Sequence, residues 1–153
     1  MFFKNEIKKR IKNEKGLTLI ELLAVIVILA IIAAIAIPAI GNIIANSRAK
    51  AVVSDAQNAL SAANIYFTDD ATATSFENNT TATPDYKSYL ESEGKITAIK
   101  VSKGTPNKID FTAVLKSDTY KFSAVSLDDL TSFKVKEGLI YKSDGTTLAG
   151  TKQ

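Results

Sequence analysis

Glu21 is the residue whose position most needs a chemical explanation. It is the one charged residue in the apolar stretch that runs from residue 17 to residue 40, and Gly16 stands immediately before that stretch. An unpaired carboxylate in a low-dielectric environment costs several kcal/mol, so an ionisable residue in a membrane-length helix usually serves a function. The chemistry open to Glu21 is to pair with a cation that shares its environment.

Few other residues could support chemistry. The chain has neither cysteine nor histidine, which excludes disulfides and thiol chemistry and removes the commonest general base and metal ligand. The acidic pairs Asp69 with Asp70 and Asp128 with Asp129 could ligate a cation, but we interpret them as solvated turns or helix caps. Two N-x-[ST] triplets within residues 78–81 fit loop composition better than glycosylation. The sequence shows no nucleophile–base pair, phosphate-binding loop or metal cluster, so we expect neither enzymatic activity nor a cofactor.

Charge is distributed unevenly along the chain. Residues 1–16 hold six basic and two acidic side chains, whereas the remainder holds 13 basic and 14 acidic ones. The net charge of +3 therefore comes from a basic leader. Positive charge beside an apolar span tends to stay in the cytoplasm, which places the N-terminus inside and everything after the span outside. We interpret the leader as a topology signal, and no direct nucleic-acid site is evident.

The apolar stretch is long enough to cross a membrane. At about 1.5 Å per residue, residues 17–40 form a helix of roughly 36 Å, against about 30 Å of hydrocarbon. The stretch also exceeds the roughly 7–15 apolar residues of a secretory signal peptide. Pro38 and Gly41 fall at its end, and we predict a helix break there, in the form of a kink or a locally loosened stretch.

The helical pattern continues through residues 41–68 as an amphipathic helix. Small and apolar residues recur at spacings of three and four, which is the period of one helix face. The stripe comprises Ala49, Val52, Ala56, Ala59, Ala63 and Tyr66, with Val53, Leu60 and Phe67 beside it. The stripe should pack on the folded domain, while the first half of the helix must be buried in lipid or in other copies of the chain.

The sequence after the long helix, residues 69–153, predicts a small β-sheet. Residues 69–94 form a loop with a helical turn near residues 75–77 and a short helix at 85–93. Residues 95–153 supply strands at 95–102, 108–116, 119–126 and 133–141, then a tight turn and an edge strand at 146–149. Inward residues alternate along two of these strands: Ile109, Phe111, Ala113 and Leu115, and Tyr120, Phe122 and Ala124. We predict an α+β fold in which the long helix, hydrophobic and then amphipathic, packs against about four antiparallel strands.

The N-terminal motif resembles the class III signal peptide of type IV pilins and related pilin-like proteins. The resemblance covers roughly residues 10–50. It rests on the basic leader, a glycine, an apolar residue directly after it, a glutamate five residues past the glycine, and a long uninterrupted helix. Pro38 also stands where these proteins commonly have a proline. The residues that carry the motif are Gly16, Leu17, Thr18, Leu19, Ile20 and Glu21.

The resemblance implies a processing route. A membrane-embedded aspartyl peptidase, the prepilin peptidase, would cut between Gly16 and Leu17 on the cytoplasmic side. The new α-amine of Leu17 would then be methylated. The family most often has phenylalanine at this first mature position, and leucine keeps an apolar side chain there. Because glycine has no side chain, it lets an active site approach the backbone closely.

The resemblance also assigns Glu21 a role. In the family, this carboxylate pairs with the amine of a neighbouring subunit. The pair would offset the cost of the buried charge and set the axial register, while apolar helix faces supply the affinity.

Three functions fit the sequence. The first is the structural subunit of an extracellular type IV pilus, stored as a single-pass plasma-membrane protein and assembled into a helical homo-oligomer for adhesion, motility or aggregation. Its partners would be the prepilin peptidase, the assembly platform protein and the assembly ATPase. The second is a pseudopilin of a DNA-uptake or type II secretion-like system. The third is a membrane-anchored or secreted small binding domain, cut after Ala36 or left intact.

Overall fold

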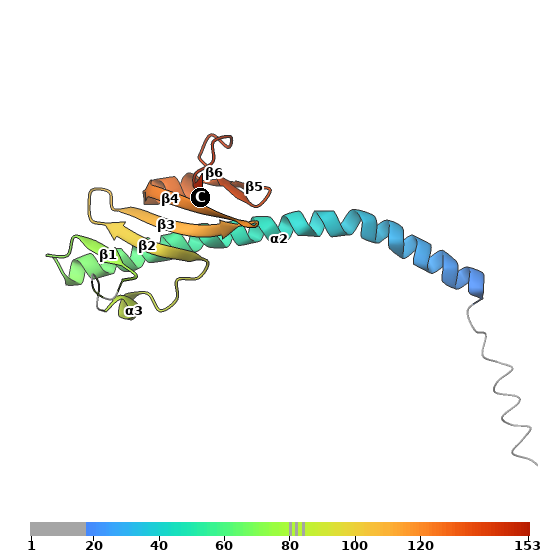
Figure 1. Ribbon diagram of the computed structural model, residues 1–153, viewed down its shortest axis with the longest axis horizontal. Helices are drawn as coiled ribbons and strands as arrows, with labels where there is room; N and C mark the ends of the chain where they lie inside the picture. The colour runs from blue at the N-terminus through green and yellow to red at the C-terminus, as the bar shows by residue number, and fades with distance from the viewer. Residues whose placement is uncertain (1–17, 80, 82, 84) are drawn as a thin grey trace, which may run out of the picture. The chain divides into compact units, whose positions relative to one another are not determined.

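A computed structural model describes residues 18–79, 81, 83 and 85–153 of the chain (Figure 1). The chain divides into two compact units, Met1–Ile40 and Gly41–Gln153. The first helix that the structure describes, α2, spans Leu19–Asp69 and supplies residues to both units. The other helices and the strands of the described residues belong to the second unit.

The second half of α2 carries the predicted apolar stripe. Its buried residues recur every three or four positions, as one face of a helix requires. They are Ala49, Val52, Ala56, Ala59, Leu60, Ala62, Ala63 and Phe67. Alanine dominates this face, so the helix can lie close to the strands that it covers, and its side chains join theirs in one hydrophobic core.

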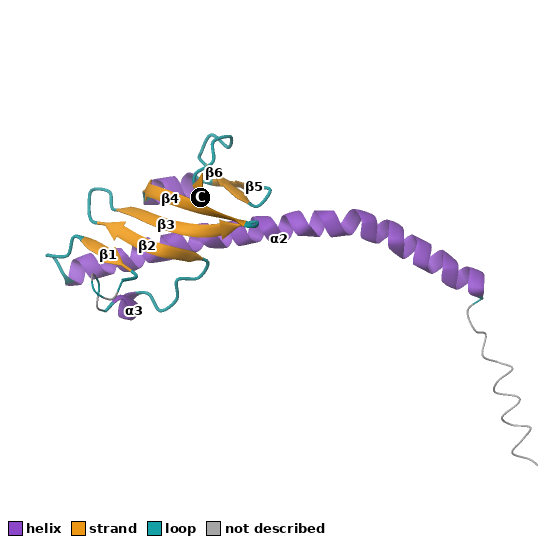
Figure 2. Cartoon of the chain, in the orientation of Figure 1, coloured by secondary structure: helices purple, strands orange, loops and turns teal. Residues whose placement is uncertain are grey.

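A five-stranded antiparallel sheet packs on this face, and the predicted α+β fold is confirmed (Figure 2). The strand order is β1-β2-β3-β4-β7, against about four strands predicted, and the predicted strands 95–102, 108–116 and 119–126 correspond to β2, β3 and β4. The strands are β1 (Ser75–Glu77), β2 (Ile96–Ser102), β3 (Lys108–Leu115), β4 (Asp118–Val125) and β7 (Thr151–Lys152). Neighbouring β3 and β4 place Phe111 opposite Phe122, and their rings stack with centroids 4.5 Å apart in the centre of the core.

Four polar contacts fix α2 to the rest of the second unit, and one of them, at the last residue of the helix, runs from the Tyr89 hydroxyl to Asp69 at 3.0 Å. The side-chain oxygen of Asn46 accepts the Gly138 N–H at 2.7 Å, and an Asp55 carboxylate oxygen accepts the Lys95 N–H at 2.6 Å. Near the end of the helix, the Asn107 side-chain amide donates to the Asn64 side-chain oxygen at 2.7 Å. At about 100° per residue, Asn46 and Asn64 lie on one side of the apolar stripe and Asp55 on the other. The helix is therefore held along both edges of its buried face.

Several local predictions are wrong. Residues 75–77 form β1, not a helical turn, because Phe76 is buried opposite Val101 in the sheet. The predicted strand 133–141 is a separate hairpin, β5 (Lys134–Lys136) and β6 (Leu139–Tyr141), which turns at Glu137 and Gly138. The edge strand predicted at 146–149 forms only an isolated bridge between Leu148 and Tyr141, and β7 lies further along the chain.

Other departures concern helices and strand register. A short helix, α4 (Leu127–Ser132), lies between the segments predicted as strands at 119–126 and 133–141, where no helix was predicted. The helix predicted at 85–93 is shorter, as α3 spans Tyr86–Tyr89. In β4, Ala124 has a φ of 54° and the register shifts beside it, so Val125 takes the buried position expected for Ala124. An irregularity of this kind breaks the two-residue alternation on which the prediction relied.

Candidate assembly and processing site

A reciprocal hydrogen-bonded cap starts α2. The Thr18 backbone N–H and the Thr18 hydroxyl donate to Oε2 of Glu21, at 2.7 and 2.8 Å. The Glu21 N–H donates in return to the Thr18 hydroxyl oxygen at 3.2 Å. This is a capping box, in which Thr18 is the N-cap and Glu21 the third residue of the helix. The negative charge of Glu21 at a helix N-terminus is favourable in addition.

The cap uses only one of the two carboxylate oxygens of Glu21. Both bonds from Thr18 end on Oε2, and Oε1 accepts no hydrogen bond from any residue that the structure describes. A carboxylate can accept several donors at once. Glu21 can therefore hold the start of its own helix and, with Oε1, accept a donor from another molecule.

Two of the predicted site residues, Gly16 and Leu17, lie outside the described residues. Thr18, the next residue along, directly precedes α2 and is exposed. The cleavage between Gly16 and Leu17 and the methylation of Leu17 stay predictions.

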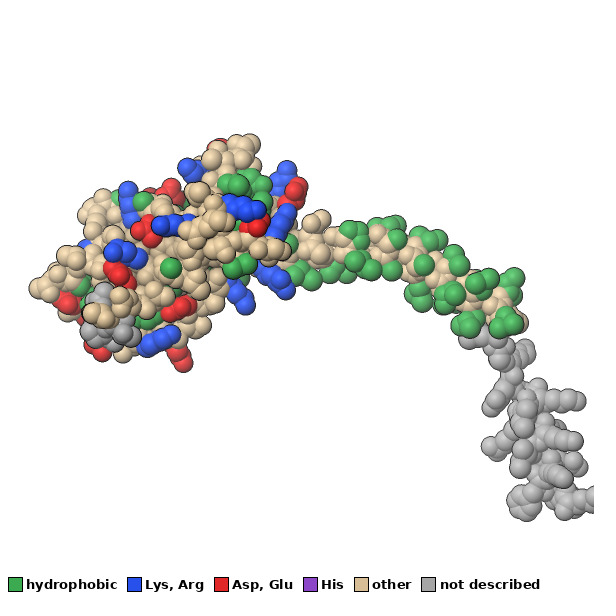
Figure 3. All heavy atoms as spheres, viewed as in Figure 1, with side chains coloured by type: hydrophobic (Ala, Val, Ile, Leu, Met, Phe, Trp, Pro, Cys, Tyr) green, Lys and Arg blue, Asp and Glu red, His purple; other side chains and the backbone are tan. Residues whose placement is uncertain are grey.

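The side chains that follow Glu21 form a continuous apolar surface. Among the residues that the structure describes, α2 is the one helix long and apolar enough to cross a membrane, and no residue of its most apolar window is buried. The exposed fraction of Leu19 is 89%. Figure 3 shows apolar side chains along the first half of α2 and mixed charges over the second unit. The large exposed apolar residues are Leu19, Ile20, Leu22, Leu23, Val25, Ile26, Val27, Ile28, Leu29, Ile31, Ile32, Ile35, Ile37, Ile40, Ile43 and Ile44.

The free energy gained by removing this apolar surface from water determines which environment it must occupy. Burial of a large aliphatic side chain contributes about 1.5–3 kcal/mol, so even partial burial of this set amounts to about 20 kcal/mol. That exceeds the stability of an ordinary domain, which is about 5–15 kcal/mol. The first half of α2 must therefore be covered by lipid or by other apolar helices, and the chain is anchored in a membrane.

Pro38 and Gly41 both lie within α2. The helix runs through both residues without interruption, so the predicted break does not separate two helices. Proline has no N–H to give to the carbonyl one turn earlier, and one backbone hydrogen bond is missing at that point. A kink or a local loosening of the helix during assembly stays a prediction.

The weaker sequence candidates serve the structure of the second unit. Asp129 caps α4: its carboxylate accepts the Ser126 N–H at 3.0 Å and the Ser126 hydroxyl at 2.7 Å, and the backbone bond is the larger cause that lowers the pKa of Asp129. Asp70 accepts the Thr72 N–H and hydroxyl in a turn. No group of three or more acidic residues that could hold a metal ion occurs in the described part of the chain.

Sequence reasoning missed the role of Thr18. The signal was present, because a threonine followed three residues later by glutamate, directly before an apolar run, is the sequence pattern of a capping box. The capping role explains why a hydroxyl residue stands between the predicted cleavage position and the apolar helix. It does not depend on cleavage, since the Thr18 N–H remains after a cut at Leu17.

Comparison with known proteins gives one match, to a family model. Residues 11–37 match the family model described as the prokaryotic N-terminal methylation motif. The matched segment includes Gly16, Leu17, Thr18 and Glu21, and it ends one residue before Pro38. Neither the comparison with curated proteins nor that with solved structures returned a match.

Proposed function

From the premise that the chain is a type IV pilin-like protein with a class III signal peptide, we propose that it is the structural subunit of an extracellular type IV pilus. Proteins with this motif are structural, not catalytic. Processing by a prepilin peptidase and anchoring in the membrane follow from the motif and from the apolar half of α2. The finer steps, which are storage in the plasma membrane with the N-terminus inside and assembly outside the cell, belong to the proposal.

The observation that carries the proposal is Oε1 of Glu21, which accepts no hydrogen bond from the part of the chain that the structure describes. Cleavage after Gly16 leaves a cationic amine on Leu17, four residues from a carboxylate whose Oε2 already holds the helix start. An intact cap leaves Oε1 for the amine of the next subunit. In a filament core this pair removes much of the cost of an isolated buried carboxylate and fixes the register between subunits.

Polymerisation then replaces lipid contacts with helix contacts. Because lipid tails are as apolar as the side chains of α2, transfer between the two environments gains little from the hydrophobic effect. The gain comes from close packing of small residues and from the Glu21 pair. Ala33, Ala34, Ala36 and Ala39 lie in the second half of the span, where they let neighbouring backbones approach. The assembly platform protein and the ATPase would supply the work of extraction from the membrane.

Glu21→Gln separates the two tasks of this residue. Glutamine keeps an oxygen that can accept the Thr18 bonds, since glutamine also occurs at this position of a capping box, but it cannot form an ion pair. We expect cells with this variant to cut the leader normally and to hold the subunit in the membrane without surface fibres. Thr18→Ser, which keeps the hydroxyl cap, is the matched control and should give wild-type fibres.

Electron microscopy of sheared surface material and detection of the subunit in membranes provide the measurement. Normal fibre numbers with Glu21→Gln would show that Glu21 is a helix cap only. Short stubs instead of long fibres in the wild type would favour a pseudopilin of a DNA-uptake or secretion system, which shares the same motif.

A further inference from the structure

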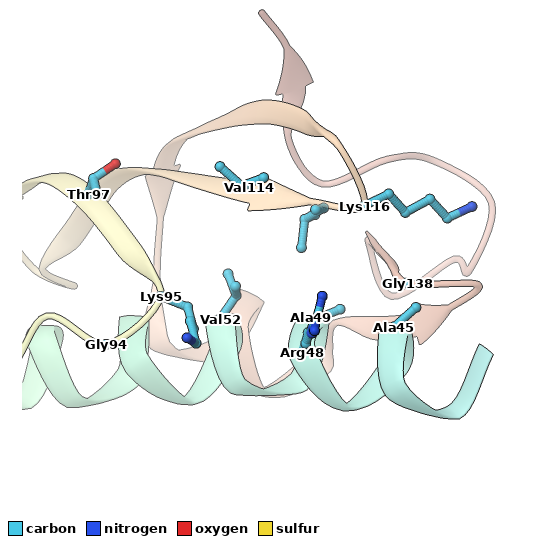
Figure 4. A pocket seen from close by; sticks show the side chains of 11 residues that line it. Ala45, Arg48, Ala49, Val52, Gly94, Lys95, Thr97, Val114, Lys116 and Gly138 are labelled. Carbon is cyan, nitrogen blue, oxygen red and sulfur yellow. The ribbon is translucent and has the colours of Figure 1, made fainter. Parts of the chain in front are cut away.

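A groove in the second unit lies between α2 and the adjoining ends of β2 and β3. Its volume is about 460 Å³, and its lining residues come from the helix, the two strands and the β5–β6 turn. Figure 4 shows Ala45, Ala49 and Val52 along the helix side, and Val114 and Leu115 complete the apolar lining. The floor is thus made of hydrocarbon side chains, although the groove opens to solvent.

The rim of the groove is cationic. Arg48, Lys95 and Lys116 are all exposed and belong to its lining, which includes no acidic residue. Figure 4 shows the Lys95 side chain directed toward α2 and Lys116 extending past the end of β3. Within the described ranges, no ion pair involves these three residues, whereas Lys87, Lys100 and Lys152 each face a carboxylate. Asp55 lies beside the groove, where its Oδ2 accepts the Lys95 backbone N–H, and it is not among the residues that line the groove.

The sequence position of Arg48 relates the groove to the membrane. Residues 22–47 contain no charged side chain, and Arg48 is the first charged residue after Glu21. As a helix, the interval from Glu21 to Arg48 measures about 40 Å, which matches the roughly 40–45 Å of a bilayer with its headgroup layers. Ile43 and Ile44, just before Arg48, are exposed and apolar. When the span is inserted, Arg48 reaches the level of the lipid phosphates.

We propose that this groove binds the headgroup of an anionic phospholipid in the leaflet that faces the folded unit. Arg48 and Lys95 bind the phosphate, Lys116 adds positive charge at the rim, and the apolar floor covers the glycerol and the first acyl carbons. A guanidinium suits this task because it presents paired N–H donors to phosphate oxygens. The proposal rests on membrane storage of the subunit, and it assigns the stored form a bound lipid that must leave on assembly.

The test uses the full-length chain in nanodiscs that contain equal amounts of phosphatidylglycerol and phosphatidylcholine. Native mass spectrometry measures which lipids stay on the protein after the disc is removed. Each basic side chain near an anionic surface strengthens attraction about fivefold. We therefore expect the wild type to retain phosphatidylglycerol preferentially, and Arg48→Gln with Lys95→Gln, which removes two basic side chains, to lower that preference about 25-fold.

The matched control is Lys108→Gln with Lys121→Gln, which removes two exposed lysines of β3 and β4 outside the groove. This variant should retain lipid as the wild type does. Near-ultraviolet circular dichroism of the tyrosines checks that both variants are folded. Equal retention by the groove variant and the control would overturn the lipid site.

Two further outcomes distinguish a lipid headgroup from free phosphate as the bound anion, and test whether the subunit is stored in a membrane. Inorganic phosphate added at millimolar concentration should leave the retained phosphatidylglycerol unchanged, and displacement by phosphate would show an anion site with no lipid specificity and overturn the proposal. A chain that fails to insert in nanodiscs contradicts membrane storage as well. A chain that inserts without lipid preference overturns only the lipid site and leaves pilus assembly, read from sheared fibres, intact.

Discussion

The turn of the β5–β6 hairpin should tolerate no side chain at Gly138. This residue has a φ of 74°, a region that costs L-residues about 1–2 kcal/mol. A Cβ placed there would stand 2.7 Å from the Cβ of Ala45 on α2, closer than two carbons can approach. Overpacking of this kind costs about 1–3 kcal/mol. The Gly138 N–H also donates to Asn46, so a shift that relieves the clash strains this bond.

We therefore expect Gly138→Ala to destabilise the second unit by about 2–5 kcal/mol, since the two costs act on one residue and add. For a domain of about 110 residues, each kcal/mol lowers Tm by about 4 °C, so the expected fall is about 8–20 °C. The assay is thermal unfolding of the full chain in detergent micelles, followed by near-ultraviolet circular dichroism. All five tyrosines belong to the second unit, so this signal reports on it alone.

Gly41→Ala is the matched control for the same chemical change. Gly41 is helical, and an added Cβ would meet no atom within 4 Å. Alanine favours a helix over glycine by up to about 1 kcal/mol, so this variant should unfold at the wild-type temperature or slightly above it. If Gly138→Ala unfolds at the same temperature as Gly41→Ala, the hairpin is not fixed against α2 as described.

The remaining predictions concern a helix cap, a helix clamp and the predicted helix break. The pKa of Asp129 is lowered in the folded state, so its cap stabilises the fold above the ordinary carboxyl pKa near 4 and loses this effect as pH falls through the lower folded-state value. The Tm of Asp129→Asn should therefore fall less steeply on acidification than the Tm of the wild type. Parallel plots of Tm against pH for the two proteins would contradict this role. Asp55→Ala leaves the Lys95 N–H without its acceptor and should lower Tm by about 4 °C in the same assay, whereas an unchanged Tm would show that this clamp contributes nothing. Pro38→Ala restores a backbone donor to α2 and should slow its amide exchange near residue 34, and equal exchange would show that proline does not loosen the helix.

The secondary structure of segments whose apolar residues recur at regular intervals could be predicted from the sequence. The stripe from Ala49 to Ala63 follows the helix period, and Ile109 to Leu115 follow the strand period, because burial on one face fixes both patterns. These two patterns are sufficient to predict a long helix against an antiparallel sheet. Glu21 stood out for a different reason, namely the cost of a charge in an apolar run.

Local features that break a period escaped the sequence analysis. Residues 133–141 read as one strand because apolar residues continue across Gly138, although glycine after Glu137 marks the turn. β1 is three residues long, and it forms only because β2 offers an edge and the core accepts Phe76. A helix cap was among the interpretations given for Asp128 and Asp129, and Asp129 forms one with Ser126, but the short helix that it starts was not predicted.

The proposed subunit interaction depends on what the first residue of the mature chain is. Mass spectrometry of the N-terminal peptide, from material sheared off cells, measures cleavage, methylation and incorporation into fibres together. The expected peptide begins at Leu17 and carries one methyl group on its amine. A fibre protein that still begins at Met1 would leave Glu21 without the proposed partner, and one that begins after Ala36 would lack Glu21 altogether. Either result would contradict assembly through that pair.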